Sequence, residues 1–215
     1  MDPVSPAASR LSPEPWPWVE WGASQITFEG ETVCGDRHLV QPFDGGVLTV
    51  VLDGLGHGVE AAAAAQVAIA TLEVHAHEPA ITLLQRCHQA LRPTRGAAIS
   101  LASFNTTYGT MTWLGIGNVE GVLLRADKNT VPAQESIMLF AGVAGHQISS
   151  LRAVVTPVSS GDLLIFFTDG VRRDFLSDPI PPQAPQRVAE HICAKYSKGT
   201  DDSLVLVARY LGGPH

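Results

Sequence analysis

The stretch VLTVVLDGLGHG, residues 47–58, decides how the rest of this chain is interpreted. Its first six residues are apolar except for Thr49, and three of them are valine, which is typical of a strand buried on one face or on both. Asp53 follows directly, and three glycines stand among the next five residues. Because glycine lets a backbone approach a ligand closely, we interpret this strand and its turn as a device for holding a cation.

Composition predicts a globular protein and excludes several classes of function. The chain has 215 residues, of which 45% are hydrophobic and 16% charged, so it can bury a sizeable core. The net charge of −7 and the lack of a Lys/Arg run argue against a nucleic-acid partner. The cysteines are few, far apart and without metal-ligand spacing, which indicates free thiols in a reducing compartment; they are Cys34, Cys87 and Cys193. Without a membrane-spanning or signal segment, we expect a cytoplasmic protein that does not bind membranes.

Patterning divides the chain into a proline-rich N-terminal arm, residues 1–20, and one domain, residues 21–212. Three tryptophans near this boundary, Trp16, Trp18 and Trp21, are expected to pack back onto the body. The predicted helices are 59–77, 80–91 and 185–196, and the predicted strands are 24–29, 38–43, 47–52, 97–105, 108–115, 121–125, 136–140, 151–156, 163–168 and 204–210. Regular alternation of strand and helix is absent, so antiparallel sheets with segregated helices are favoured.

Aspartates stand at the ends of several apolar strands. Asp53 and Asp169 each follow one, Asp201 and Asp202 precede the last, and Asp36 precedes a fourth. Any single Asp–Gly pair is also a common turn, and we accept the interpretation as a plain turn for Asp44–Gly45 and for Gly161–Asp162. A sheet, however, brings strand ends together, and collected carboxylates repel one another unless a cation compensates them. Oxygen ligands suit Mg²⁺ or Mn²⁺.

The ordered set of motifs resembles the metal-dependent protein phosphatases of the type 2C (PPM) superfamily, in their compact bacterial SpoIIE/RsbX-like branch. The motifs that carry the resemblance are Gly35–Asp36, Asp53–Gly58 running into an alanine-rich helix, Gly161–Asp162, Phe167–Val171 and Asp201–Asp202. The resemblance spans most of the chain. It implies an α+β fold, a four-layer α-β-β-α sandwich of two antiparallel β-sheets flanked by helices, with a centre of two Mn²⁺ or Mg²⁺ ions at one end.

The resemblance also implies a role for individual residues. Asp53 would bridge both metals, and the Gly54 carbonyl would hold one of them. Asp169 and Asp201 would hold the other, while Asp202 matches the position after the usual ligand. Asp36 would act through metal-bound water. Hydrolysis would then proceed by in-line attack of a metal-activated water on phosphorus, without a covalent phosphoenzyme.

Two positions depart from many eukaryotic relatives. A histidine there follows the Asp–Gly pair directly, whereas this chain has Leu55 at that position and a histidine at His57. We assign His57 to organising the turn at the catalytic centre in preference to donating a proton. Arg37 is a candidate for phosphate binding, with a salt-bridging surface arginine as the alternative. Arg172 and Arg173 could meet an acidic or phosphorylated protein surface, or form a solvated pair.

The implied protein is a free-standing, monomeric serine/threonine phosphatase. Its implied substrates are phosphorylated stress-signalling proteins, namely the STAS-domain subunits of the stressosome. Two alternatives stay open at this point. One is a non-catalytic module of the same fold that binds phosphoproteins, which the complete acid set disfavours. The other is a phosphatase that acts on small phosphomonoesters.

Overall fold

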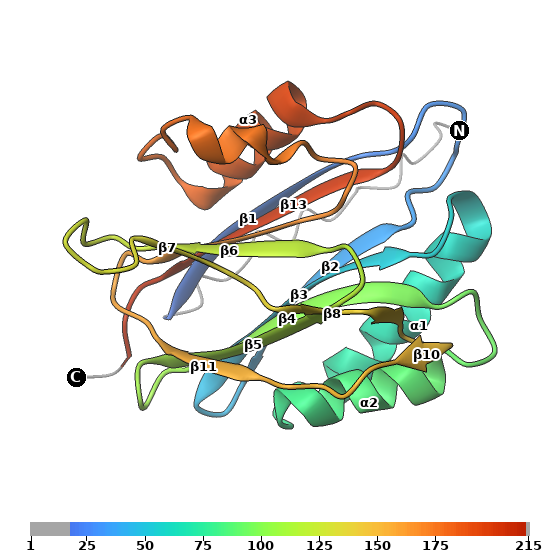
Figure 1. Cartoon of the computed structure of the whole chain (residues 1–215), viewed down its shortest axis with the longest axis horizontal. Coiled ribbons are helices and arrows are strands. Elements are labelled where there is room, and N and C mark those ends of the chain that lie inside the picture. Colours follow the sequence, from blue (N-terminus) through green and yellow to red (C-terminus); the bar gives the residue numbers. More distant parts are fainter. Residues whose placement is uncertain (1–17, 214–215) are drawn as a thin grey trace, which may run out of the picture.

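A computed structural model of the chain describes residues 18–213, which form two β-sheets packed face to face with helices on both outer sides (Figure 1). The helices are α1 (Gly58–His75), α2 (Ala80–Ala90), the short 3₁₀ helix η1 (Arg173–Ser177) and α3 (Pro185–Tyr196). The strands are β1 (Val19–Ile26), β2 (Asp36–Phe43), β3 (Gly46–Gly54), β4 (Ala97–Asn105), β5 (Thr110–Ile116), β6 (Glu120–Leu124), β7 (Gln134–Ser136), β8 (Leu139–Phe140), β9 (Gly142–Val143), β10 (Gln147–Ile148), β11 (Val154–Pro157), β12 (Leu163–Phe167) and β13 (Ser203–Tyr210).

The two main sheets are built almost wholly from antiparallel pairs, and β9 and β10 form a further, two-stranded antiparallel sheet. One main sheet has the strand order β1-β13-β12-β6-β7, and the other has the order β11-β5-β4-β3-β2, with β8 added in parallel to β5. Helix α3 covers the first sheet, and helices α1 and α2 cover the second (Figure 1). The predicted four-layer α-β-β-α sandwich is therefore confirmed.

Three hydrophobic cores lie between the four layers. The apolar strands contribute side chains to two of these cores, one on each face of the strand. In β3, Val47 and Val51 face the core between the sheets, whereas Leu48, Val50 and Leu52 face helices α1 and α2. Strand β12 divides in the same way between the inter-sheet core and the core under α3. Because successive residues of a strand point to opposite faces, a strand covered on both sides is apolar throughout.

The alanine-rich sequence of α1 lets this helix lie against the end of β3. A Cβ atom placed on Gly54 would come 2.1 Å from the carbonyl oxygen of Ala61, and one on Gly35 would come 2.9 Å from the Ala61 Cβ. Both distances are too short for a side chain. Glycine in the strand ends and alanine in the helix are therefore required for this close packing.

The structure corrects several predicted boundaries. The first strand is Val19–Ile26 and not 24–29, so two residues assigned to the arm pair with β13. The predicted strand 136–140 is wrong: it splits into β7 and β8, which belong to different sheets. Strands of two or three residues are too short to show an alternation of apolar and polar residues. The boundary between β7 and β8 could therefore not be predicted from the sequence. The remainder of the predicted arm, with Trp16, lies outside the described residues, while Trp18 and Trp21 pack on the inter-sheet core as predicted.

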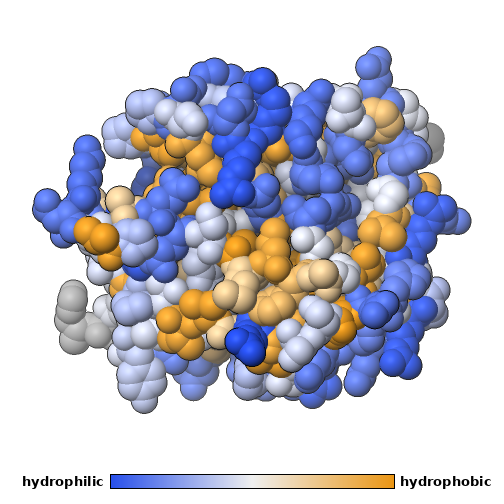
Figure 2. Space-filling model, viewed as in Figure 1, coloured by the Kyte–Doolittle hydropathy of each residue, from blue (hydrophilic) through white to orange (hydrophobic). Residues whose placement is uncertain are grey.

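Hydrophilic side chains cover much of the face shown in Figure 2, but hydrophobic ones gather across its middle. Figure 1 places β8, β10 and β11 in this region. Met138, next to β8, and Val155, in β11, are 49% and 62% exposed. Within the described residues, no helix is long and apolar enough to cross a membrane.

Candidate metal centre

The acidic residues predicted from strand ends collect at one end of the inter-sheet space. Asp36 and Asp53 stand directly opposite each other in the register of β2 and β3. Asp169 follows β12, and Asp201 and Asp202 precede β13, the strand that pairs with β12. One sheet thus supplies the first two carboxylates, and the other sheet supplies the remaining three.

Asn118 connects the carboxylates of the two sheets. It lies in the turn between β5 and β6, where the chain crosses from one sheet to the other. Its Nδ2 donates hydrogen bonds to Asp169 Oδ2 at 2.7 Å and to Asp53 Oδ2 at 3.3 Å. The sequence analysis did not identify Asn118, because Gly117–Asn118 is indistinguishable from an ordinary turn.

Thr168 and Lys198 are further polar residues of the site that the sequence analysis missed. The buried Thr168 hydroxyl donates to Asp36 Oδ2 at 2.8 Å and accepts the Leu204 N–H at 2.9 Å. Lys198 donates its ammonium to the backbone carbonyl of Asp169. The one available signal was Thr168 itself, a polar residue that closes an apolar strand immediately before an aspartate.

Burial and mutual repulsion raise the pKa values of two of the carboxyl groups. Burial, followed by the charge of Asp53, raises the pKa of Asp36 from 3.8 to about 8. Burial, followed by the charge of Asp169, raises the pKa of Asp53 to about 7. Both groups therefore keep their protons to a higher pH than an ordinary aspartate until a positive charge compensates them. That behaviour is expected of residues that receive a cation.

Asp202 is placed differently from Asp201. Both oxygens of its buried carboxylate accept backbone N–H groups, from Phe28 at 2.8 Å and from Gly35 at 2.6 Å. This side chain thus fixes the segment that leads into Asp36. Asp201 is partly exposed. The contacts therefore favour Asp201 as the ligand and Asp202 as the residue that positions the neighbouring chain.

The donor set fits Mg²⁺ or Mn²⁺ and not zinc, because every candidate ligand is an oxygen. Within residues 18–213, no group of three or more Asp, Glu, His or Cys side chains lies close enough together to hold a metal ion by itself. The acids instead approach in pairs, Asp36 with Asp53 and Asp53 with Asp169. Mg²⁺ commonly binds through one or two carboxylates and keeps several waters. Paired acids beside the Gly54 carbonyl suit that mode of binding.

His57 and Arg37 lie at the edge of this centre. His57 is the N-cap residue of α1, and its exposed ring pairs with Glu31 and packs 6.0 Å from the Phe28 ring. Arg37 points to the face of β2 opposite Asp36, and its guanidinium donates to two backbone carbonyls, those of Cys34 and Asp36. The structure does not bring Arg37 among the acids, so its phosphate contact stays a prediction that this orientation disfavours.

Two further features predicted from the sequence, Asp162 and the pair Arg172 and Arg173, lie outside the metal centre. Asp162 is buried at the opposite end of β12 from Asp169, where it pairs with Arg125 and accepts the backbone N–H groups of Ala126 and Ser159. It therefore holds a turn and lies outside the acid group. Arg172 and Arg173 pair with Asp174 and Glu120 at the surface.

Comparisons with known proteins agree with this geometry. The family model of stage II sporulation protein E (SpoIIE) matches residues 44–211. The phosphoserine phosphatase RsbX of Bacillus subtilis (strain 168) is 27% identical over 149 residues, which are 68% of this chain and 72% of RsbX.

Solved structures give the same result. A chain from a structure of the bacterial stressosome is 30% identical, with a TM-score of 0.78 over 89% of this chain and 99% of its own length. The structure of RsbX in complex with magnesium has a TM-score of 0.77 at 22% identity, over 90% of this chain and 96% of its own. The family model, the curated relative and the fold agree, and the chain belongs to the SpoIIE family of phosphatases.

Proposed function

We propose that the acid cluster is the metal centre of a serine/threonine protein phosphatase that hydrolyses phosphoserine or phosphothreonine in bacterial stress signalling. The observation that carries the proposal is the meeting of Asp53, at the end of β3, with Asp169, at the end of β12, through one Asn118 amide. Similarity to the phosphoserine phosphatase RsbX supports the same activity.

The residues have distinct roles in this proposal. Asp53, the Gly54 carbonyl, Asp169 and Asp201 hold two divalent cations, Mn²⁺ or Mg²⁺. When bound, these cations supply an activated water and neutralise charge on the phosphoryl group. Thr168 fixes the Asp36 carboxylate, which orients water at the centre. Asp202 holds the backbone of the segment before Asp36.

The substrates proposed are phosphorylated STAS-domain subunits of a stressosome. Similarity to RsbX and to a chain of a stressosome structure supports them. A cytoplasmic location agrees with three buried free cysteines. A direct assay would mix the protein with phosphorylated STAS-domain protein and Mn²⁺ and measure phosphate release.

The metal centre is tested with two matched variants. Asp53→Asn should abolish Mn²⁺-dependent hydrolysis of p-nitrophenyl phosphate, because it removes a carboxylate that would hold the cations. Asp44→Asn changes an exposed aspartate that also precedes a glycine, in the β2–β3 turn, and should keep wild-type turnover. Full activity of Asp53→Asn would show that the assignment is wrong.

A wild-type protein without any metal-dependent hydrolysis would favour the non-catalytic binding module, and activity confined to small esters would favour the small-molecule alternative.

A further inference from the structure

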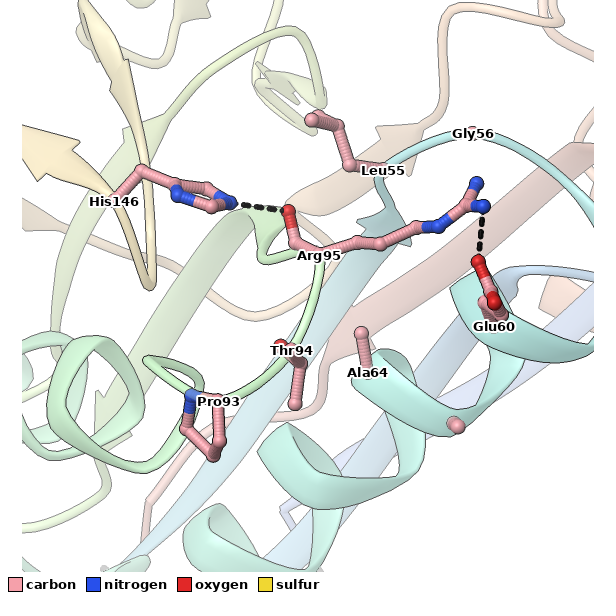
Figure 3. A pocket seen from close by; sticks show the side chains of 9 residues that line it. Leu55, Gly56, Glu60, Ala64, Pro93, Thr94, Arg95 and His146 are labelled. Carbon is pink, nitrogen blue, oxygen red and sulfur yellow. Dashed lines mark hydrogen bonds and ion pairs between the residues drawn. The ribbon is translucent and has the colours of Figure 1, made fainter.

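A pocket of about 790 Å³ opens at the turn that directly follows Asp53–Gly54 (Figure 3). We call it the side pocket. It lies between the N-terminal half of α1, the turn after β3 and the segment 93–95 that leads into β4. Its volume is far greater than that of one water or ion and lies in the range of ligand sites in proteins. The metal-centre residues do not line this pocket, so the roles proposed for those residues give it no function.

The side pocket is joined rigidly to the metal centre. Leu55 and Gly56, which line it, come directly after Asp53–Gly54. The Leu55 N–H donates to the Gly96 carbonyl at 3.0 Å, and this bond fixes the turn to the start of β4. A substrate chain with its phosphoseryl group at Asp53 would therefore have the side pocket close to its neighbouring residues.

The walls of the side pocket are mostly apolar and are made of small side chains. Leu55 is 42% exposed at its edge, the exposed Ala63 and Pro93 stand at its rim, and the buried Ala64 lines its floor. Gly56 adopts a φ of +87°, and a Cβ there would come 2.9 Å from the Arg95 guanidinium. The space is open because alanine and glycine stand where larger side chains would fill it.

Charged groups mark one side of the side pocket. The Arg95 side chain extends toward Glu60 on α1 and forms an ion pair with it, and the His146 ring contacts the Arg95 carbonyl at 2.7 Å (Figure 3). The side chains of Arg95 and Glu60 are 52% and 67% exposed, so water screens the pair and a competing carboxylate can reach the guanidinium. The side pocket thus offers an apolar surface next to an accessible cation.

We propose that the side pocket binds the substrate segment that flanks the phosphoserine, taking one apolar side chain against Leu55 and Ala63 and a neighbouring acidic side chain against Arg95. This inference rests on the proposed phosphatase function and adds the substrate sequence that it selects. Burial of a large part of a leucine side chain is enough to set a preference of about ten-fold.

Phosphoserine peptides test the proposal in the Mn²⁺-loaded protein. The peptides have an alanine and glutamine background in which a single leucine is moved one position at a time. At one position, leucine should raise kcat/KM about ten-fold over the all-alanine peptide. Ala63→Phe should fill the side pocket and bring this ratio close to one. Ala70→Phe changes an exposed alanine of the same helix that does not line the side pocket, and it should keep the wild-type ratio.

A second pair of measurements covers the polar side and the risk of misfolding. Leu55→Ser removes one apolar wall by a surface change and should also lower the leucine preference. Arg95→Gln should remove any gain from a glutamate placed next to the preferred leucine. A wild-type protein that hydrolyses every peptide without preference, or a preference that survives both Ala63→Phe and Leu55→Ser, would overturn the side-pocket proposal alone. If the wild-type protein hydrolyses no phosphoserine peptide, the proposed function itself fails.

Discussion

Thr168 and Asp36, which are 132 residues apart in sequence, are joined by a hydrogen bond of 2.8 Å between the two sheets. The hydroxyl donates to the carboxylate and accepts the Leu204 N–H, so one buried group satisfies partners on β2 and β13. Both partners would be left unsatisfied by its removal, and unsatisfied buried polar groups are costly. This bond therefore connects the stability of the sandwich to the position of Asp36.

Thr168→Val keeps the shape of the side chain and removes the hydroxyl. We expect it to lower the free energy of unfolding of the metal-free protein by about 1–3 kcal/mol, because a buried carboxyl group and a backbone N–H lose their partner. Urea unfolding would measure the loss. Thr107→Val, at an exposed threonine in the turn between β4 and β5, is the matched control and should change stability little. Equal effects of the two substitutions would show that the Thr168 bond contributes nothing specific.

The metal-free protein should become less stable as the pH rises from about 4 to about 8. In this range the folded state holds protons on Asp36, with a pKa of about 8, and on Asp53, with a pKa of about 7, that the unfolded chain has already released. Since the folded state binds more protons, the free energy of unfolding falls with rising pH. Thermal unfolding in the presence of EDTA, followed across this range, would measure the trend.

Two additions make the pH experiment decisive. Mn²⁺ should raise the melting temperature most at the alkaline end of the range. There fewer protons compete with the cation for the two carboxylates, so the cation binds more tightly. Asp36→Asn removes one of the two titrating groups, so its metal-free stability should depend less steeply on pH. A wild-type protein whose stability rises steadily with pH would contradict the raised pKa values.

Asn118 should matter most when no metal is bound. Its amide donates to the same carboxylates that would receive the cations, so Asn118→Ala removes the donor that they share and, above the Asp53 pKa of about 7, leaves Asp53 and Asp169 to repel each other. We expect a lower melting temperature without metal and a larger increase on saturation with Mn²⁺ than in the wild type. Asn129→Ala removes a comparable amide, one that donates to Asp127 away from the centre. If both variants respond to Mn²⁺ as the wild type does, Asn118 has no part in the centre.

Asp162 should contribute to stability and not to catalysis. Its side chain is 2% exposed and its partner Arg125 9%, and Arg125 also pairs with Glu135, so Asp162→Asn weakens one of two partners of a buried cation. Breaking a buried pair so that a charge is left uncompensated costs about 3–5 kcal/mol and an exposed pair is worth about 0–1 kcal/mol, so we expect an intermediate loss of about 1–3 kcal/mol. Asp174→Asn, at the exposed pair with Arg172, is the control. The specific activity of folded Asp162→Asn should equal that of the wild type, and a selective loss of metal dependence would contradict this assignment.

The fold was largely predictable because its central strands are covered on both faces. The sequences of β3 and β12 carry side chains for two cores each, which makes them unbroken apolar runs. Strands β7 to β10 are only two or three residues long and partly exposed. β7 and β8 pair with β6 and β5, whereas β9 and β10 pair with each other, and strands of this length are too short to show a sequence period.

The candidate site was predictable to a similar extent. Asp36, Asp53, Asp169 and Asp201 could be located because each stands where an apolar strand begins or ends. Asn118 and Lys198 could not, since each lies in a polar connection where a functional side chain and a solvated one look alike. Asn118 comes close to Asp53 and Asp169 together only when one sheet packs on the other, and Lys198 comes close to Asp169 only when β12 and β13 pair. The sequence pattern of either residue's own segment does not predict that contact.

The division of the acids between two sheets has a consequence for the order of events during folding. In a folding intermediate with only one sheet formed, that sheet places together either Asp36 and Asp53 or the carboxylates next to β12 and β13. The two sets are not yet close to each other. The β5–β6 connection that bears Asn118 acquires its final position only when the sheets associate. Phosphatase activity should therefore be the last property to appear during refolding, after secondary structure has formed, and it can serve as a kinetic reporter of sheet docking.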